Sequence, residues 1–360
     1  MISSDECLLQ AVGAEGVGTP DASLPDTGHA LSVVVPVFNE AQVLPEFHRR
    51  LLDVLHGQAI RFEVIYVDDG SRDGSVAVLR EFQRSEPAVG VMRLSRNFGK
   101  EAALSAGLRA ACGACVIVID ADLQDPPELI PEMLRAWQQG HDVVNMHRRS
   151  REGETWFKTT SAGLFYGLLN RLSQVPIPED VGDFRLLSRR AVDALNSMPE
   201  RNRYMKGLFA WVGFGQLTLD YDRDPRAAGV AKQNYWRLWG LAIDGITSFS
   251  IAPLRVASLG GLLAAGLAFA LTVFYGVKAL LFGDSAQGFP TLIVAILSLG
   301  GMNLLAMGVI GEYLGRLFVE SKQRPLFVVD EFALPQSRRV ALRPPLAALQ
   351  PSPEGAREAA

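Results

Sequence analysis

Residues 115–128 read Cys-Val-Ile-Val-Ile-Asp-Ala-Asp-Leu-Gln-Asp-Pro-Pro-Glu, an apolar run that changes abruptly to carboxylates. The run from Cys115 to Ile119 is typical of a buried strand. If the strand continues, the alternation of side chains aims Asp120 and Asp122 to the same side. Two carboxylates at such a short distance repel each other. A hard divalent cation, Mg²⁺ or Mn²⁺, would remove this repulsion by binding both carboxylates together with the phosphate oxygens of a ligand. The stretch therefore predicts a metal site with Asp120 and Asp122 as ligands.

The alternative is a polar loop in which an aspartate caps the next helix. Asp125 stands directly before Pro126 and Pro127, and that capping role suits it. An Asp-x-Asp pattern alone is a weak signal. Its place at the end of a buried strand favours the metal site for Asp120 and Asp122.

The sequence on both sides of this stretch indicates the fold class. From Leu31 to Met146, short apolar runs alternate with segments of helical periodicity. The runs predict strands at 31–37, 62–67, 89–94, 115–119 and 142–146, and the segments between them predict helices at 42–55, 75–84, 100–111 and 127–139. Continuously apolar strands that alternate with helices indicate an α/β fold with a parallel sheet covered on both faces. Ligands of such sheets bind beyond the carboxyl ends of the strands, so the polar residues there are the candidates for a site.

The composition limits the classes of function. The chain has 360 residues, 48% of them hydrophobic, and a formal net charge of −4, which gives no indication of a nucleic-acid partner. Its 3 cysteines are too few for a disulfide framework, and the pair at 112 and 115 precedes a strand, unlike a redox Cys-x-x-Cys. Residues 1–30 lack a basic and apolar signal sequence and are expected to form a disordered leader. The tail after Ala333, rich in Pro, Ala and Arg, is also expected to be disordered.

Two later segments are long and apolar. Residues 256–282 and 289–309 each exceed the roughly 20 residues that cross a bilayer. The linker at 283–288 is short, so the two segments predict a tight hairpin. Basic residues lie outside the hairpin and not in its linker, namely Arg237, Arg255, Arg316, Lys322 and Arg324. By the positive-inside rule we expect an integral protein of the inner (cytoplasmic) membrane, with the N-terminal domain and both termini in the cytoplasm.

Polar residues also end the first two predicted strands, as Pro-Val-Phe-Asn-Glu at 36–40 and Asp-Asp-Gly-Ser-Arg-Asp-Gly-Ser at 68–75. Together with 120–128 these segments resemble glycosyltransferase family 2, whose nucleotide-sugar-binding domain has the GT-A fold. More narrowly they resemble the polyprenyl-phosphate glycosyltransferases, which include dolichol-phosphate mannose synthases and bactoprenol glucosyl transferases. Further segments support the resemblance, which covers about Leu31 to Val329: 147–154, 165–173, 181–195, 205–214, 244–250 and 311–316.

The resemblance implies a division of the chain into five parts. We expect a disordered leader at 1–30, a Rossmann-like GT-A catalytic domain at 31–235 and an interfacial amphipathic segment at 236–252. A two-helix transmembrane hairpin at 253–320 and a partly disordered cytoplasmic tail at 321–360 would follow. Related proteins suggest a homo-oligomer by analogy only.

The resemblance also implies roles for single residues. Pro36, Glu40 and Asp69 would line the nucleoside pocket, and Asp120 and Asp122 would meet the metal and the diphosphate, with Gln124 beside them. Asp183 would face the sugar and the reaction centre and would be catalytic together with Asp122. On the acceptor side, Arg148 and Arg151 would hold the phosphate of the lipid.

Arg226 and Lys232 match a mobile segment that closes over the diphosphate in the family. The hydroxyl and aromatic residues usual in that segment are replaced here by Ala231 and Gln233. The sequence therefore does not predict whether this segment closes as it does in the family.

The implied reaction is the inverting transfer of one sugar from a nucleotide sugar, UDP-linked by preference, to the phosphate of a polyprenyl phosphate such as undecaprenyl phosphate. It would take place at the cytoplasmic face of the membrane and serve the cell envelope. Two alternatives stay open: a processive polysaccharide synthase, which would use more membrane helices and a Gln-x-x-Arg-Trp segment, and a non-catalytic membrane scaffold or lipid-sugar binding protein. The sequence does not choose the sugar.

Overall fold

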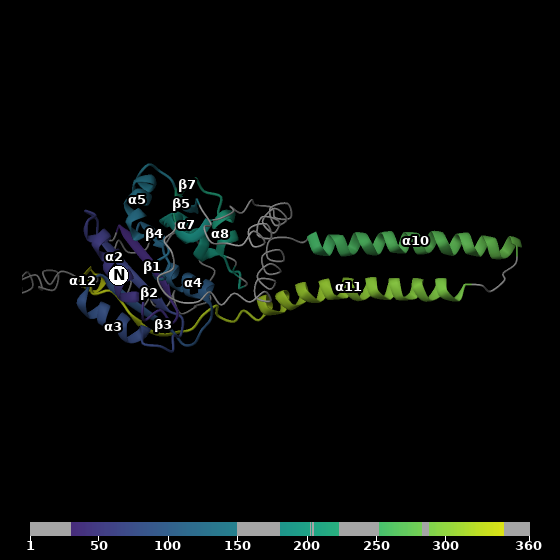
Figure 1. Cartoon of the computed structure of the whole chain (residues 1–360), viewed down its shortest axis with the longest axis horizontal. Helices are drawn as coiled ribbons and strands as arrows, with labels where there is room; N and C mark the ends of the chain where they lie inside the picture. The colour runs from purple at the N-terminus through teal and green to yellow at the C-terminus, as the bar shows by residue number, and fades with distance from the viewer. Residues whose placement is uncertain are drawn as a thin grey trace, which may run out of the picture.

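The structure is a computed structural model that describes residues 30–149, 181–201, 203, 205–222, 252–282 and 288–341. A single eight-stranded sheet lies at the centre of the N-terminal domain (Figure 1). Its strands are β1 (Leu31–Val37), β2 (Phe62–Asp68), β3 (Val89–Leu94), β4 (Cys115–Val118), β5 (Val143–Arg148), β6 (Val181–Ser188), β7 (Gln216–Tyr221) and β8 (Val329–Ala333). They lie in the order β7-β5-β6-β4-β1-β2-β3-β8. The prediction of an α/β fold is confirmed.

The prediction of a parallel sheet is wrong in one respect, because the sheet is mixed. The four central strands β4, β1, β2 and β3 are parallel, but β6 runs antiparallel between β4 and β5, and β8 runs antiparallel along β3. An antiparallel strand begins at the edge where its parallel neighbours end. The start of β6, which carries Asp183, therefore lies beside the end of β4, which leads to Asp120.

Helices cover both faces of this sheet. On one face α2 (Leu44–His56), α3 (Ser75–Ser85), the short 3-10 helix η1 (Pro127–Leu129) and α5 (Ile130–Gln138) pack on one hydrophobic cluster. On the other face α4 (Lys100–Ala110), α7 (Arg189–Ser197) and α8 (Met205–Trp211) pack on a second cluster. The α4 helix lies so close to β1 that a Cβ at Gly107 would come within 2.2 Å of Val34 Cγ1. Glycine at this position brings the first residue of α4, Lys100, near the sheet.

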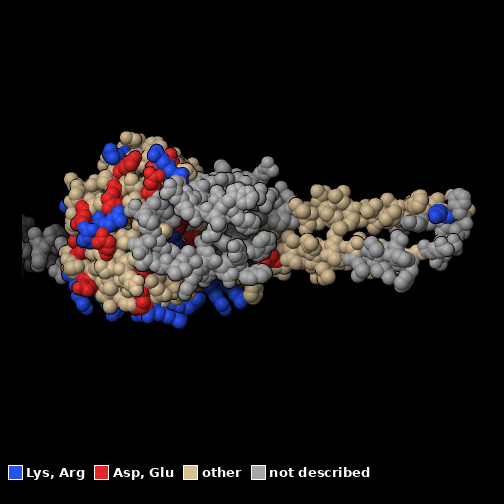
Figure 2. Space-filling model, in the orientation of Figure 1, with Lys and Arg blue, Asp and Glu red and all other residues tan. Residues whose placement is uncertain are grey.

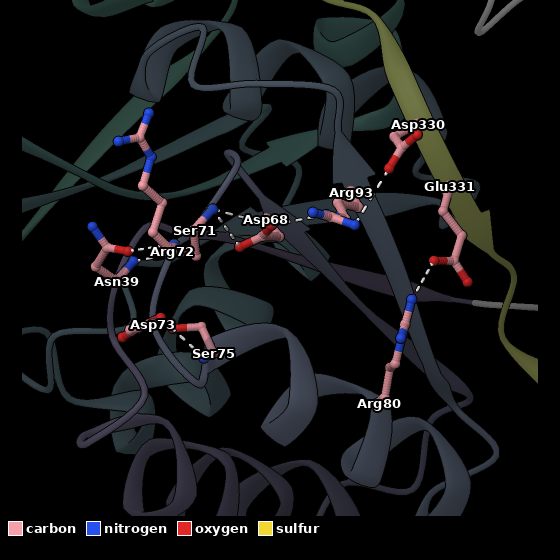
Figure 3. A network of polar contacts seen from close by, with 10 residues as sticks. All are labelled: Asn39, Asp68, Ser71, Arg72, Asp73, Ser75, Arg80, Arg93, Asp330 and Glu331. Carbon is pink, nitrogen blue, oxygen red and sulfur yellow. Dashed lines mark hydrogen bonds and ion pairs between the residues drawn. The ribbon is translucent and has the colours of Figure 1, made fainter.

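The C-terminal segment belongs to the same domain. Strand β8 extends the sheet beyond β3, and Figure 3 shows two of its side chains turned toward arginines of the domain. Asp330 lies 3.4 Å from Arg93 of β3, and Glu331 lies 2.7 Å from Arg80 of α3. The disorder predicted after Ala333 is wrong for its first residues, because they form helix α12 (Gln336–Ala341), and residues 342–360 lie outside the described part of the chain.

Arg338 of α12 explains why this segment is ordered. Its guanidinium forms a buried ion pair with Glu63 at the start of β2, with Nε 2.5 Å from Oε2. It also donates to the carbonyl of Ala110 at the end of α4. Ser32 and the backbone N–H of Cys112 donate to the same carboxylate. Burial opposes the ionisation of Glu63, but the hydrogen bonds and charge of Arg338 hold its pKa below the ordinary value.

Two long helices, α10 (Ala252–Phe282) and α11 (Phe289–Ser321), project from the domain and contact each other (Figure 1). On the face seen in Figure 2 they carry few charged side chains, in contrast with the domain. Large apolar side chains face outward along both, such as Leu262 and Leu304, which are 69% and 71% exposed. Within the described residues, one stretch is long and apolar enough to cross a membrane, Ser298–Ser321, and a shorter apolar stretch lies at Val256–Leu271. The two apolar helices are therefore confirmed, while a second full span, predicted within 256–282, is not.

Candidate functional site

A cluster of charged side chains lies where β4 ends and β6 begins. Asp120 follows β4 and Asp183 lies at the start of β6, as the strand directions require. The ammonium group of Lys100, at the first turn of α4, lies between them. Its Nζ is 2.7 Å from Asp120 Oδ2 and 2.5 Å from Asp183 Oδ2. The structure thus joins two predicted site residues through a lysine that the sequence analysis did not include.

The charges of this cluster shift one another's pKa. Burial opposes the ionised forms, yet the two carboxylates raise the pKa of Lys100, so it carries a positive charge throughout the physiological range. For Asp183, Lys100 and then Lys206 outweigh burial and hold its pKa well below the ordinary value. The pKa of Asp120 is raised, first by burial and also by the negative charge of Asp183. Asp183 is therefore a carboxylate at neutral pH.

Lys100 had a signal in the sequence. It ends Asn-Phe-Gly-Lys at 97–100, directly after the third strand, and the carboxyl end of that strand falls on the same edge as those of β1, β2 and β4. The polar segments that indicated the site follow the first, second and fourth predicted strands, at 36–40, 68–75 and 120–128. Applied to β3 as well, the rule would have included Lys100.

Asp69, predicted for the nucleoside pocket, holds the loop that leads to Lys100. Its two carboxylate oxygens accept hydrogen bonds from the backbone N–H groups of Phe98, at 2.7 Å, and Gly99, at 2.9 Å. Gly99 has φ of 100°, a conformation that favours glycine. Burial raises the pKa of Asp69 despite these hydrogen bonds. Asp69 thereby helps to fix the position from which α4 starts.

The loops after β1 and β2 are joined by polar contacts, as Figure 3 shows. Asn39 has a positive φ of 57°, donates its backbone N–H to Ser71 Oγ at 2.9 Å, and accepts from the N–H of Arg72 at 2.8 Å. The N–H of Glu40 donates to Ser75 Oγ at 3.0 Å. Pro36 lies in β1 itself and pairs with Val67 of β2. The predicted nucleoside-side residues Pro36 and Glu40 therefore lie at the same edge of the sheet as Asp69.

The predicted metal ligands fit a divalent cation by their chemistry. Asp120 and Asp122 offer carboxylate oxygens, the donors that Mg²⁺ and Mn²⁺ prefer, and such ions take further ligands from phosphates and water. Asp122 Oδ1 accepts from the backbone N–H of Gln124 at 3.2 Å, which gives the turn its shape. Across the described ranges, no group of three or more His, Cys, Asp or Glu side chains is arranged to hold a metal. A metal at this edge stays a prediction.

Arg148, predicted for the acceptor phosphate, lies at the last residue of β5. It is opposite Tyr221 of β7, and its Nε donates to Tyr221 Oη at 3.3 Å. The Tyr221 hydroxyl donates to Asp125 Oδ1 at 2.5 Å. Asp125 is buried and does not cap η1, whose N-cap residue is Pro126 without a side-chain hydrogen bond. The capping role suggested for Asp125 is therefore wrong, because its carboxylate faces the β5–β7 pair.

Three predicted site residues, Arg151, Arg226 and Lys232, lie outside the described residues. The same holds for the predicted interfacial segment up to residue 251. Their roles stay predictions.

Glu101, next to Lys100, gives a pH-dependent prediction. Burial and then the charge of Asp183 raise its pKa from the ordinary 4.5 to about 7. Because the folded pKa is above the unfolded one, its contribution to stability is complete below about pH 4.5 and is lost as the pH rises through 7. We compare the free energy of unfolding of Glu101→Gln with that of the parent protein. We expect this difference to shift in favour of the variant, by on the order of 1–3 kcal/mol, as the pH rises from about 5 to about 8. Thermal unfolding of both proteins at the two pH values measures this shift, and a difference independent of pH would contradict it.

Comparison with known proteins gives consistent matches. The model of the family described as Glycosyl transferase family 2 matches residues 32–195. An uncharacterized glycosyltransferase of Synechocystis is 48% identical over 301 residues, 84% of this chain and 95% of that protein. The bactoprenol glucosyl transferase of Shigella phage SfV is 43% identical over 83% of this chain and 97% of its own length. The prophage bactoprenol glucosyl transferase homolog of Escherichia coli K12 is 42% identical over 83% and 98%.

Proposed function

The chain belongs to glycosyl transferase family 2, and we propose that it transfers one sugar from a nucleotide sugar to the phosphate of a polyprenyl phosphate. One observation carries the proposal: Asp120, Lys100 and Asp183 lie together at the carboxyl edge of the sheet, and the guanidinium of Arg148 lies against Gly182, the residue before Asp183. The edge thus offers carboxylates for a donor diphosphate with its cation and an arginine for a second phosphate. The two relatives named for bactoprenol support a polyprenyl acceptor.

The donor would bind over the ends of β1, β2 and β4. Pro36, Glu40 and Asp69 would line the nucleoside side, and Asp120 and Asp122 would lie at the diphosphate with Gln124 beside them. A divalent cation held by Asp120 and Asp122 would supply positive charge to the diphosphate as it leaves. A UDP-linked donor is favoured by the likeness to the bacterial enzymes.

The acceptor phosphate would lie at Arg148, whose planar guanidinium suits paired hydrogen bonds to phosphate. One oxygen of the acceptor phosphate forms a bond to the anomeric carbon of the sugar. At the same time the bond from that carbon to the diphosphate oxygen of the donor breaks, and the nucleoside diphosphate leaves with the electron pair. A single displacement inverts the configuration, so an α-linked donor gives a β-linked lipid phosphate. A phosphate is already anionic near neutral pH and needs no general base. Asp183, held ionised by Lys100, would orient the sugar.

The long helices would bring this edge to the membrane. The chain leaving α11 meets the sheet at the carboxyl end of β3, where the N–H of Ser95 donates to the carbonyl of Val328 at 2.9 Å. Near the end of α11, Glu320 accepts from the backbone N–H of Arg201 at 3.0 Å. The edge that carries the charged cluster is therefore the edge at which the chain leaving α11 meets the sheet. We propose that α10 and α11 form a transmembrane hairpin with the catalytic domain on the cytoplasmic face.

A donor screen tests the proposed function. Membranes that contain the protein are incubated with undecaprenyl phosphate, Mg²⁺ or Mn²⁺, and one radiolabelled nucleotide sugar at a time. We expect label in the lipid fraction with at least one donor, and more of it with UDP-sugars than with GDP-sugars. Absence of labelled lipid with every common donor, from folded protein, would rule the proposal out.

Lys100 is expected to be important for the same reaction. In Lys100→Gln the two carboxylates of Asp120 and Asp183 lose the ammonium group that joins them, and we expect transfer to fall about a hundredfold. Lys322→Gln is a matched control, because it removes the same charge from a lysine outside the cluster. Lys322 directly follows α11, and its ammonium group lies over the ring of Phe318. Initial rates of lipid labelling compare the two variants. A loss below threefold in Lys100→Gln, or an equal loss in Lys322→Gln, would show that Lys100 is not part of the site.

A further inference from the structure

We propose that Tyr221, fixed by Asp125, aims the guanidinium of Arg148 at the acceptor phosphate, and that Gly182 leaves the room for it. This inference rests on the proposed function. Tyr221 and Asp125 are thus positioning residues, and Arg148 is the group that contacts the phosphate.

The strand register sets up the contact. Arg148 and Tyr221 are paired across the parallel strands β5 and β7, each at the last residue of its strand. Adjacent residues of neighbouring strands project their side chains to the same face. The Tyr221 ring is held edge-on against Phe184, with the centroids 6.2 Å apart, and the residue is 4% exposed. The packing of the ring therefore fixes the position of the hydroxyl group independently of Arg148.

The direction of the hydrogen bonds gives Tyr221 its role. The phenol has one proton, and it goes to Asp125 Oδ1 at 2.5 Å, so the oxygen lone pairs accept from Arg148 Nε at 3.3 Å. Burial, and then the charge of Asp125, raise the pKa of Tyr221, so the proton stays on the phenol. Asp125 is itself 0% exposed, and its Oδ1 lies 4.0 Å from Arg148 Nη2. A buried carboxylate thus holds the hydroxyl and, through it, the arginine.

Gly182 completes the arrangement from the other side. A Cβ built on Gly182 would lie 2.7 Å from Arg148 Nη2, so the guanidinium rests against the backbone of β6 beside Asp183. Among the described residues, the Arg148 side chain makes one hydrogen bond, at Nε, and one longer ion pair, from Nη2 to Asp125 Oδ1 at 4.0 Å, so the N–H groups of Nη1 remain for a ligand beside Nη2. A guanidinium fixed by Nε and presenting its terminal nitrogens matches the geometry of a phosphate.

Direct binding tests the inference without turnover. Farnesyl phosphate is titrated by calorimetry into the full-length protein in detergent, and farnesol, which lacks the phosphate, is titrated alongside. In Tyr221→Phe we expect affinity for farnesyl phosphate to fall about tenfold, the effect of one hydrogen bond to a charged group, with farnesol unchanged. In an Arg148→Gln background the same change should cause no further loss, because Tyr221 acts through Arg148.

Tyr66→Phe is the matched control. It also removes a buried hydroxyl, which lies 2.8 Å from His48 Nδ1 in the core, away from Arg148. If Tyr221→Phe does not fold, Gly182→Ala displaces Arg148 from the opposite side and should give the same selective loss. Equal affinity of Tyr221→Phe and the parent protein for farnesyl phosphate would overturn the inference. So would an equal loss for farnesol, or a further loss in the Arg148→Gln background.

The two proposals can fail separately. If the parent protein transfers sugar and Tyr221→Phe keeps full affinity for farnesyl phosphate, the positioning role is wrong and the proposed function stands. If the selective loss of binding occurs but no sugar donor is used, the phosphate site stands and the proposed function is wrong.

Discussion

Replacing Asp122 with asparagine is expected to lower the rate of sugar transfer at least about a thousandfold, the size of losing a main electrostatic contribution to a reaction. The change keeps the volume of the side chain and its carbonyl oxygen, which can still accept from the N–H of Gln124. It removes the negative charge that would hold a divalent cation at the diphosphate. Removal of the metal with a chelator should reduce the parent protein to a similar rate.

The control for this prediction is Asp53→Asn. Asp53 is an exposed carboxylate on α2, paired with Arg49, and lies on the outer side of the domain. Initial rates and metal-dependent binding of the nucleotide, measured by calorimetry, should be normal in this variant. If Asp122→Asn bound the nucleotide with the same metal dependence as the parent protein, the Asp-x-Asp metal site would be wrong.

Replacing Arg338 with methionine is expected to destabilise the protein by about 3–5 kcal/mol, the cost of leaving one partner of a buried ion pair alone. Glu63 is 0% exposed and would keep only Ser32 and the N–H of Cys112 as donors. The carbonyl of Ala110 would also lose the guanidinium as a donor and would keep the weaker contact from the Cys112 thiol, at 3.7 Å. We expect the midpoint of thermal unfolding to fall by roughly 10 °C.

Two further variants separate this effect from a general loosening of the C-terminal segment. Arg80→Met breaks the exposed ion pair with Glu331 on β8 and should cost below about 1 kcal/mol. The double replacement Glu63→Met with Arg338→Met should recover most of the loss, since apolar pairs often replace buried ion pairs without penalty. A fall in Arg338→Met no larger than that in Arg80→Met would show that α12 does not hold the segment.

The parts of the fold that followed from the sequence are those that local patterns encode. The apolar run from Cys115 to Ile119 predicted β4 and placed Asp120 and Asp122 at its end, because a buried strand needs continuous apolar residues. The alternation from Leu31 to Met146 predicted the central parallel strands and the helices between them. These features depend on neighbours within a few residues.

The features that the sequence analysis missed depend on contacts between distant segments. The antiparallel course of β6 follows from its pairing with β4 and β5, which periodicity does not report. The ordered C-terminal segment depends on Arg338 meeting Glu63, which is 275 residues away in the chain. Tyr221 reaches Asp125 only because β7 joins the sheet beside β5. Pairings of this kind arise from the tertiary fold and leave no local signature.

The sequence indicated part of the site through the polar residues that follow its predicted strands. Asp120 and Arg148 lie at the end of a predicted strand, whereas Asp183 was indicated only by the family resemblance, because no strand was predicted at 181–188. Lys100, which lies between Asp120 and Asp183, follows β3, whose end carried no predicted site residue. Asp125 was misjudged because its position before two prolines suggested a helix cap. Burial and the approach of β7 give it a different partner.

The mass of the lipid product tests the central claim most directly. Purified full-length protein is incubated with undecaprenyl phosphate, Mg²⁺ or Mn²⁺ and the donor identified in the screen, and the extracted lipid is analysed by mass spectrometry. We expect undecaprenyl phosphate carrying a single sugar, formed with an equal amount of nucleoside diphosphate and absent when the metal is chelated. Unchanged undecaprenyl phosphate, or a lipid carrying a chain of several sugars, would contradict the proposed transfer.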